Sequence, residues 1–274
     1  MSVKIKPLSN EQLNSIAPTL FTSEPHSEVS EKYHFIPTID VIEEIRANNW
    51  YPVNVAVANV RDEEKEGFQQ HCVRFRHFED LLNPKDSAVE LLLFNSHDRS
   101  KAFSISAGIF RFVCANGLVI SDSVFETYKI KHLGERDNDV ANAVANITAI
   151  KPKLMEKINK LESITLNQSE KESFAKYSIP LRFEEHLEIN HNDLLIPHRV
   201  EDSKDDLYTV LNVIQENLLR GNISGINKDT KRRFTSKEIT SISKDTEVNK
   251  GIWDIAEKIA SIKDSSYCSM AIAA

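Results

Sequence analysis

Apolar and polar residues alternate along the first half of the chain with the period of β-strands. Val53, Val55 and Val57 alternate with small or polar residues, and the run QHCVRFRHF alternates in the same way. The apolar runs AVELLLFN and FSISAGIFRFVC follow, rich in β-branched and aromatic residues. Because no helical pattern separates these strands, the sequence predicts a curved antiparallel sheet of four to six strands.

Apolar residues three or four apart predict helices on both sides of this sheet. IDVIEEIRANN predicts a helix that ends at Asn48, and a long amphipathic helix runs from Asp139 to Leu161, where Pro152 is expected to kink or split it. DDLYTVLNVIQENLLRGN begins with acids and ends at Gly221, a residue suited to a helix C-cap. A last helix around NKGIWDIAEKIASI is expected to bury three isoleucines: Ile252, Ile255 and Ile259.

These elements predict the α+β class: the curved antiparallel sheet is packed by the long amphipathic helix and followed by a mainly helical C-terminal part. Eight acidic residues fall between Glu184 and Asp206, which predicts an irregular surface segment. The expected organisation is an α+β core domain over residues 1–183, then an acidic connection and C-terminal helical region over residues 184–274.

Composition narrows the function classes. The chain of 274 residues has 34 Lys and Arg against 41 Asp and Glu, a net charge of −7 at pH 7, which excludes the strongly basic class of nucleic-acid-binding proteins. Any nucleic-acid contact must come from a local patch. The three cysteines have no C-x-x-C spacing, and no apolar run suits a signal peptide or a membrane span. We expect a cytoplasmic protein with no membrane partner.

The stretch FRFVCANGLVI raises the possibility of a catalytic cysteine. Cys114 precedes Asn116-Gly117, a pair typical of a type I′ hairpin turn, and shows no paired histidine or helix N-terminus that would lower the pKa of its thiol. A core thiol is the favoured interpretation and a nucleophile the alternative. No catalytic residue is predicted, and the protein is expected not to be an enzyme.

The stretch FNSHDRS suggests a Ser-His-Asp relay, but three consecutive residues cannot assemble one. Asn95, Ser96, His97 and Asp98 are expected to form a structural turn, with a polar binding edge as the alternative. The nine histidines show no metal-ligand spacing, and the even spacing of His71 and His77 suits a solvated strand face. Phosphate-binding and hydrolase motifs are also absent from the sequence, so neither a metal nor a cofactor is predicted.

Two clusters of cations suit a phosphate backbone. The first runs from Arg220 to Lys237 and has a local charge of +5, because it contains one acid, Asp229, and six cations: Arg220, Lys228, Lys231, Arg232, Arg233 and Lys237. The second lies on the predicted strands and their turns, among aromatic residues: Arg74, Arg76, Arg99, Lys101, Arg111, Lys129 and Lys131. The alternative interpretation is a solvated mobile loop for the first cluster and a core role for most of the aromatic residues.

Several ordered blocks between Ser30 and Glu257 resemble the prophage- and plasmid-borne family called domain of unknown function 932. The blocks include SEKYHFIPTIDVI, LLLFNSHDRS, GIFRFVCANGLV and YTVLNVIQENLLRGNISG. The family landmarks map to Tyr33, Pro37, Thr38, Asn95, Ser96, His97, Asp98, Arg111, Cys114, Asn116, Gly117, Gln215, Glu216, Asn217, Gly221, Gly225 and Trp253. The chain departs from the family after Gly225, where it has INKDTKRRF instead of a Gly- and Arg-rich run.

The resemblance implies a setting of DNA metabolism or defence evasion on a mobile element. The order of a helix, antiparallel strands and a long helix is also similar to the core of phage single-strand annealing proteins. This implies an oligomeric protein that binds or anneals single-stranded DNA in recombination. The alternative is an antidefence or antirestriction factor that acts on a host protein, which the acidic segment favours. An unrecognised enzyme is the third class, and a homo-oligomer is expected.

Overall fold

The computed structural model describes residues 6–29, 35–59, 62–85, 87–111, 116–119, 128–129 and 139–272. The chain forms two compact units, residues 1–119 with 123–152 and residues 120–122 with 153–274. The predicted boundary at residue 184 lies inside the second unit. The α+β class is confirmed, with an antiparallel sheet in each unit and a helical C-terminal part.

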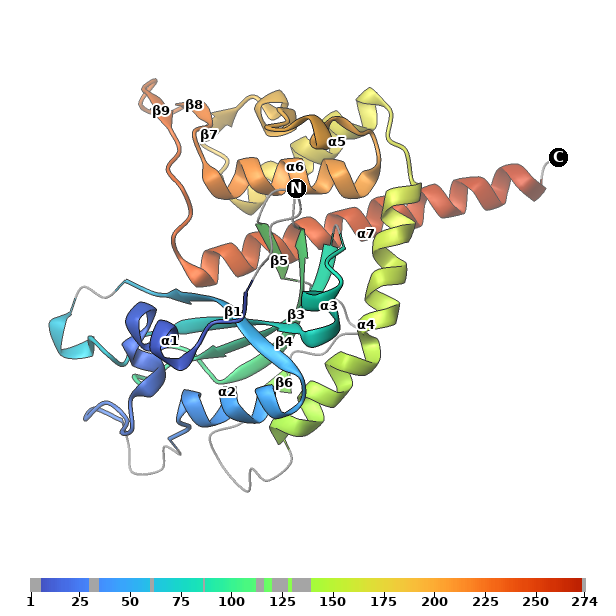
Figure 1. Ribbon diagram of the computed structural model, residues 1–274. Helices are drawn as coiled ribbons and strands as arrows, with labels where there is room; N and C mark the ends of the chain where they lie inside the picture. The colour runs from blue at the N-terminus through green and yellow to red at the C-terminus, as the bar shows by residue number, and fades with distance from the viewer. Residues whose placement is uncertain are drawn as a thin grey trace. The chain divides into compact units, whose positions relative to one another are not determined.

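The first unit is built on a six-stranded antiparallel sheet (Figure 1). Its strands are β1 (Trp50–Val57), β2 (His71–His77), β3 (Ser87–Asn95), β4 (Ser104–Arg111), β5 (Asn116–Val119) and β6 (Tyr128–Lys129). The first five follow one another in the order of the chain, and β6 pairs with β4. Every residue of β3 and β4 is buried, so the centre of this sheet forms the core of the unit.

Helices complete the first unit: α1 (Asn10–Ile16), η1 (Pro18–Phe21), α2 (Thr38–Ala47), η2 (Glu63–Lys65), α3 (Phe78–Leu82) and the first part of α4 (Asp139–Ser163). Figure 1 shows α2 along one face of the sheet. The predicted helix is confirmed in α2, which buries Val41, Ile42 and Ile45. It ends because Asn48 caps it and Asn49 takes a φ of 63°, a conformation that asparagine tolerates. The helix α4 continues through Pro152.

The predicted turn at Asn116-Gly117 is wrong. β4 and β5 do pair as antiparallel neighbours, but Asn116 lies opposite Arg111 and Gly117 opposite Phe110, so both residues belong to the strand β5. The connection is residues 112–115, and Cys114 lies there, outside the described residues. An Asn-Gly pair permits a tight turn but does not require one, because the register follows the pairing of the flanking strands.

The second unit packs helices around α6 and carries a small sheet. Its elements are α5 (Gln168–Ser178), η3 (Ile179–Leu181), β7 (Leu187–Ile189), η4 (His191–Leu195), η5 (Val200–Ser203), α6 (Leu207–Arg220), β8 (Ser224–Asn227), β9 (Arg233–Thr235) and α7 (Ile242–Ile272). β7, β8 and β9 form a three-stranded antiparallel sheet. The sequence predicted only irregular chain there, because strands of three or four residues are too short to display an alternating pattern.

The helix α6 is the centre of the second unit. The Asp206 carboxylate accepts a hydrogen bond from the Thr209 backbone N–H at 2.8 Å and begins the helix, and Gly221 ends it at a φ of 77°. Glycine is needed there for two reasons: the φ is positive, and a Cβ atom would lie 2.6 Å from the backbone of Lys237. Every residue from Leu207 to Leu218 is buried, a wider burial than the predicted single apolar face.

The predicted buried face of α7 is correct for Ile252 and displaced for the other two isoleucines. Ile252, Trp253 and Ala256 are fully buried, whereas Ile255 and Ile259 are half-buried. The large Trp253 side chain takes the inward position, and the small Ala256 side chain is buried on the same face of the helix. No helix in the described part of the chain has the length and apolar character needed to cross a membrane.

Candidate nucleic-acid interface

Two of the strand-borne cations predicted to bind nucleic acid are used inside the first unit. Arg74 Nε and Arg76 Nη2 each donate to the Glu90 carboxylate at 2.6 Å, and the side chains of Arg76 and Glu90 are only 1 % exposed. Both guanidinium groups lie over the Phe110 ring, at 5.0 and 4.6 Å from its centroid. Glu90 therefore pairs with both of the cations that make this strand look basic in the sequence.

The other predicted cations of the first unit are dispersed. Arg111 is 7 % exposed, Arg99 occupies a turn at a φ of 64°, and the Lys101 ammonium lies 5.6 Å from the centroid of the Phe94 ring. The side chain of Lys129 and the whole of Lys131 lie outside the described residues. In the described part of this unit Arg74 and Arg76 thus come together around Glu90.

The residues Ser96, His97 and Asp98 do not line up as a relay, because Ser96 and Asp98 hydrogen-bond each other, whereas Nε2 of His97 lies 3.4 Å from the Thr38 hydroxyl. The Ser96 hydroxyl bonds the backbone N–H and carbonyl of Lys101 at 2.9 and 3.0 Å, and the Asp98 carboxylate accepts from the Ser100 N–H at 2.9 Å. Ser96 and Asp98 thus bond the backbone of their own turn, as short polar side chains do.

Asn95 and His97 enter a buried polar cluster with Thr38 and His71. Nδ1 of His71 lies 3.0 Å from the Gln69 carbonyl and donates to it, so Nε2 accepts from the Thr38 hydroxyl at 2.9 Å. The Thr38 oxygen in turn accepts from the Asn95 amide at 3.0 Å. The His71 and His97 ring centroids are 5.3 Å apart. The cluster joins the first turn of α2 to β2 and β3.

Burial, together with the neighbouring His97, lowers the pKa of His71 to about 3. His71 is therefore a neutral imidazole at physiological pH. The prediction of a solvated strand face is wrong for His71, because its side chain points to the core beside Asn95 of the next strand. Among the side chains that the structure describes, no group of three or more His, Cys, Asp or Glu could hold a metal ion.

The basic segment of the second unit is a β-hairpin with a defined tip rather than a loop. The Asn227 side-chain oxygen accepts from the backbone N–H groups of Asp229 and Thr230 at 3.0 and 2.9 Å. The Asn227 carbonyl accepts from Lys231 N–H at 2.8 Å, and Lys231 has a φ of 58°. These bonds fix the backbone of the turn between β8 and β9, which carries the cations of the tip.

The hairpin presents its cations to solvent. All six predicted cations are exposed, and five of them lie on the hairpin or just after it: Lys228, Lys231, Arg232, Arg233 and Lys237. Lys228 donates to the Glu185 carbonyl at 3.0 Å, and within the described ranges no carboxylate pairs with any of these five. Arg220 differs, because its guanidinium pairs with Glu216 at 2.8 Å. Phe234 packs inward, 6.5 Å from the Phe183 ring centroid.

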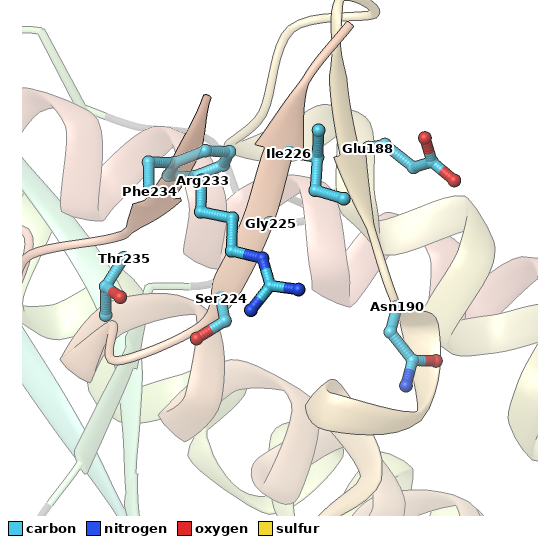
Figure 2. A pocket seen from close by; sticks show the side chains of 8 residues that line it. All are labelled: Glu188, Asn190, Ser224, Gly225, Ile226, Arg233, Phe234 and Thr235. Atoms are coloured by element: carbon cyan, nitrogen blue, oxygen red, sulfur yellow. The ribbon is translucent and has the colours of Figure 1, made fainter. Parts of the chain in front are cut away.

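A shallow groove of about 540 Å³ lies on the outer face of the three-stranded sheet (Figure 2). Cross-strand pairing places Glu188, Ile226 and Arg233 in one row across the sheet. Ser224 and Thr235 form the next row. The groove therefore runs from an acidic edge at β7 to a basic edge at β9, with an isoleucine between them.

The chain matches the family model described as "Domain of unknown function (DUF932)" over residues 25–253. It belongs to this family. The UPF0380 proteins YfjQ and YafZ of Escherichia coli strain K12 are each 31% identical to it over 255 residues, which cover 93% of this chain and 92% of the relative. No solved structure matches the chain.

In this DUF932 chain the family landmarks Glu216 and Asn217 on α6 bind the segment that precedes the helix. Glu216 is 1 % exposed and accepts from Arg199 through both oxygens, at 2.7 and 2.8 Å, which raises the pKa of Arg199. The Asn217 amide donates to the Leu194 and Ile196 carbonyls at 3.1 and 3.0 Å. The irregular segment before α6 is thus bound to the helix by side chains that sequence reasoning treated only as landmarks.

Proposed function

We propose that this protein binds nucleic acid through the exposed cations of the β8–β9 hairpin. The observation that carries the proposal is the charge of the hairpin: five exposed cations, without a carboxylate partner in the described chain, lie in its turn, on β9 or just after β9, and the backbone of the turn has a defined conformation. Arginine and lysine on such a turn contact phosphates without reading the bases. The net charge of −7 confines the attraction to this surface.

The finer form of the proposal is an oligomeric protein that binds or anneals single-stranded DNA of a mobile element. Its support is the resemblance in the order of helices and strands, together with the local rather than global positive charge. An annealing protein needs no catalytic residue, since it holds phosphates and lets the bases pair. Light scattering with and without DNA tests the oligomer, and a strict monomer in both conditions contradicts the annealing form.

The main experiment measures the salt dependence of binding to dye-labelled oligonucleotides by fluorescence anisotropy. Each phosphate contact on a single strand contributes about −0.7 to the slope of log K against log salt, so about three contacts give roughly −2. Replacing Lys231, Arg232 and Arg233 together by alanine should weaken binding equally for all sequences and flatten the slope. Folding should be unaffected, because these side chains are exposed.

The matched control replaces three exposed lysines elsewhere in the second unit, Lys153, Lys176 and Lys258, by alanine. Both variants change the net charge by the same amount, so a difference between them reports position rather than total charge. If the control loses as much affinity as the hairpin variant, binding is nonspecific and the hairpin is not the interface.

A host defence protein is the second candidate partner, and exposed acids favour it. Five acidic side chains of the segment before α6 face solvent: Glu184, Glu185, Glu188, Glu201 and Asp205. Such acids can imitate the charge of a phosphate backbone on the DNA site of a nuclease. If the folded wild-type protein binds neither DNA nor RNA at low salt, the nucleic-acid proposal fails and this candidate replaces it.

A further inference from the structure

We infer that the groove on the outer face of β7, β8 and β9 holds one nucleotide of a single strand, with its phosphate at Arg233 and its base on Ile226. This inference rests on the proposed nucleic-acid binding and adds a ligand class to it, namely nucleotides whose bases are unpaired. The groove volume of about 540 Å³ falls within the range of roughly 300–1,000 Å³ that small-ligand sites have.

Three hydrogen-bond donors converge at the basic end of the groove. Figure 2 shows the Arg233 guanidinium turned into the groove, beside the Ser224 hydroxyl. Thr235 lies directly opposite Ser224 in the register. A guanidinium with two hydroxyl groups matches the charge and the several acceptor oxygens of a phosphate. Within the described chain no carboxylate occupies this position.

The centre of the groove is apolar. Ile226 lies between Glu188 and Arg233 in the cross-strand row, and its side chain remains 40 % exposed. Gly225 beside it lets β7 approach closely, since a Cβ atom there would lie 2.7 Å from the Glu188 carbonyl oxygen. A base that covers Ile226 removes apolar surface from water, which stabilises the complex.

The partner must be single-stranded because only an unpaired base can turn its flat face onto Ile226. In a duplex both faces of every base are stacked on neighbours, and exposing one costs unstacking energy. Glu188, at the other edge of the groove, gives the bound strand a direction. Glu188 repels a second phosphate, so the strand should enter with its phosphate over β9 and its base toward β7.

The test compares three ligands by anisotropy at low salt: a thymidine homopolymer, the same single strand carrying abasic sites, and a duplex of equal length. The full-length wild-type protein should bind the base-bearing strand about threefold to tenfold more tightly than the abasic strand, since each seated base adds a modest increment. Ile226→Thr should reduce this ratio to near one and leave the affinity for the abasic strand unchanged. Threonine keeps the β-branched shape, so the strand should persist.

The matched control is Ile196→Thr, which changes an isoleucine that is 53 % exposed outside the groove. It should keep the wild-type ratio. The double variant Ser224→Ala, Thr235→Val should lower the affinities for the base-bearing and the abasic strands by the same factor, because both strands carry phosphates.

The inference is overturned if the wild-type protein binds base-bearing and abasic strands equally, or if Ile226→Thr retains the difference. In either case the proposed function stands as long as the hairpin variant of Lys231, Arg232 and Arg233 loses salt-dependent binding. If the wild-type protein binds none of the three ligands, both the groove and the hairpin proposals fail.

Discussion

The arginines of β2 and those of the β8–β9 hairpin look alike in the sequence, where each pair stands beside a phenylalanine. The structure separates them. Arg74 and Arg76 share the buried carboxylate of Glu90, whereas Arg232 and Arg233 face solvent and have no carboxylate partner among the described residues. A basic strand thus becomes a basic surface only when no acid lies opposite it in the sheet.

The difference has a thermodynamic consequence. A buried ion pair affects the stability of the fold strongly when it is broken, because removing one partner leaves the other charge buried without compensation. Exposed cations lose little when neighbours change, since water and salt screen them. Substitutions around Glu90 should therefore alter stability, and substitutions on the hairpin should alter binding.

The largest effect should follow from Glu90→Gln. Arg74 and Arg76 would then lie against a neutral amide, and the free energy of unfolding should fall by about 3–5 kcal/mol, measured by urea denaturation. The control Glu43→Gln removes an exposed partner of Arg46, 52% exposed, and should cost about 0–1 kcal/mol. Equal small losses in both variants would remove the distinction between buried and exposed pairs.

The sequence predicted this part of the fold but not its pairing. The strands β1 to β4 and the helices α2, α4 and α6 follow from patterns that span eight or more residues. The pairing of Arg76 with Glu90 does not, because it depends on the register between β2 and β3, and a shift of one residue would turn each side chain to the other face. The burial of His71 escaped prediction for the same reason.

The second effect is a dependence of stability on pH that comes from His71. Its pKa is about 3 in the folded protein and 6.5 in the unfolded chain, so the unfolded state binds more protons between these values. The contribution of His71 is complete above pH 6.5 and is lost as pH falls toward 3. The loss should be about 1.4 kcal/mol per pH unit.

Chemical denaturation at several pH values measures this slope, and His71→Gln provides the comparison. Glutamine can accept from Thr38 and donate to the Gln69 carbonyl, so the cluster keeps its hydrogen bonds without a titrating group. The variant should be less sensitive to acid than the wild-type protein. Parallel slopes for the two proteins would show that His71 is not the group that titrates.

The candidate interface was only half predictable. The count of cations identified the segment from Arg220 to Lys237, because charge is visible in the sequence. Arg220 pairs with Glu216 because the two residues are four apart on α6. The groove depends on three short strands, which place Ile226 beside Arg233. Neither the strands nor the Asn227 turn produces a periodic signal.

The smallest effect should come from Lys231→Asn, which moves stability and binding in opposite directions. Lys231 has a φ of 58°, where asparagine is tolerated better than lysine, so the free energy of unfolding should rise by about 0.5 kcal/mol. The loss of one phosphate contact should make the salt slope about 0.7 less steep. Lys237→Asn is the matched control, because it removes an exposed charge from a position without a positive φ. It should weaken binding without the gain in stability. A loss of stability in Lys231→Asn would mean that the lysine side chain supports the hairpin tip, and the separation between a stabilising interior and a binding surface would then fail at this residue.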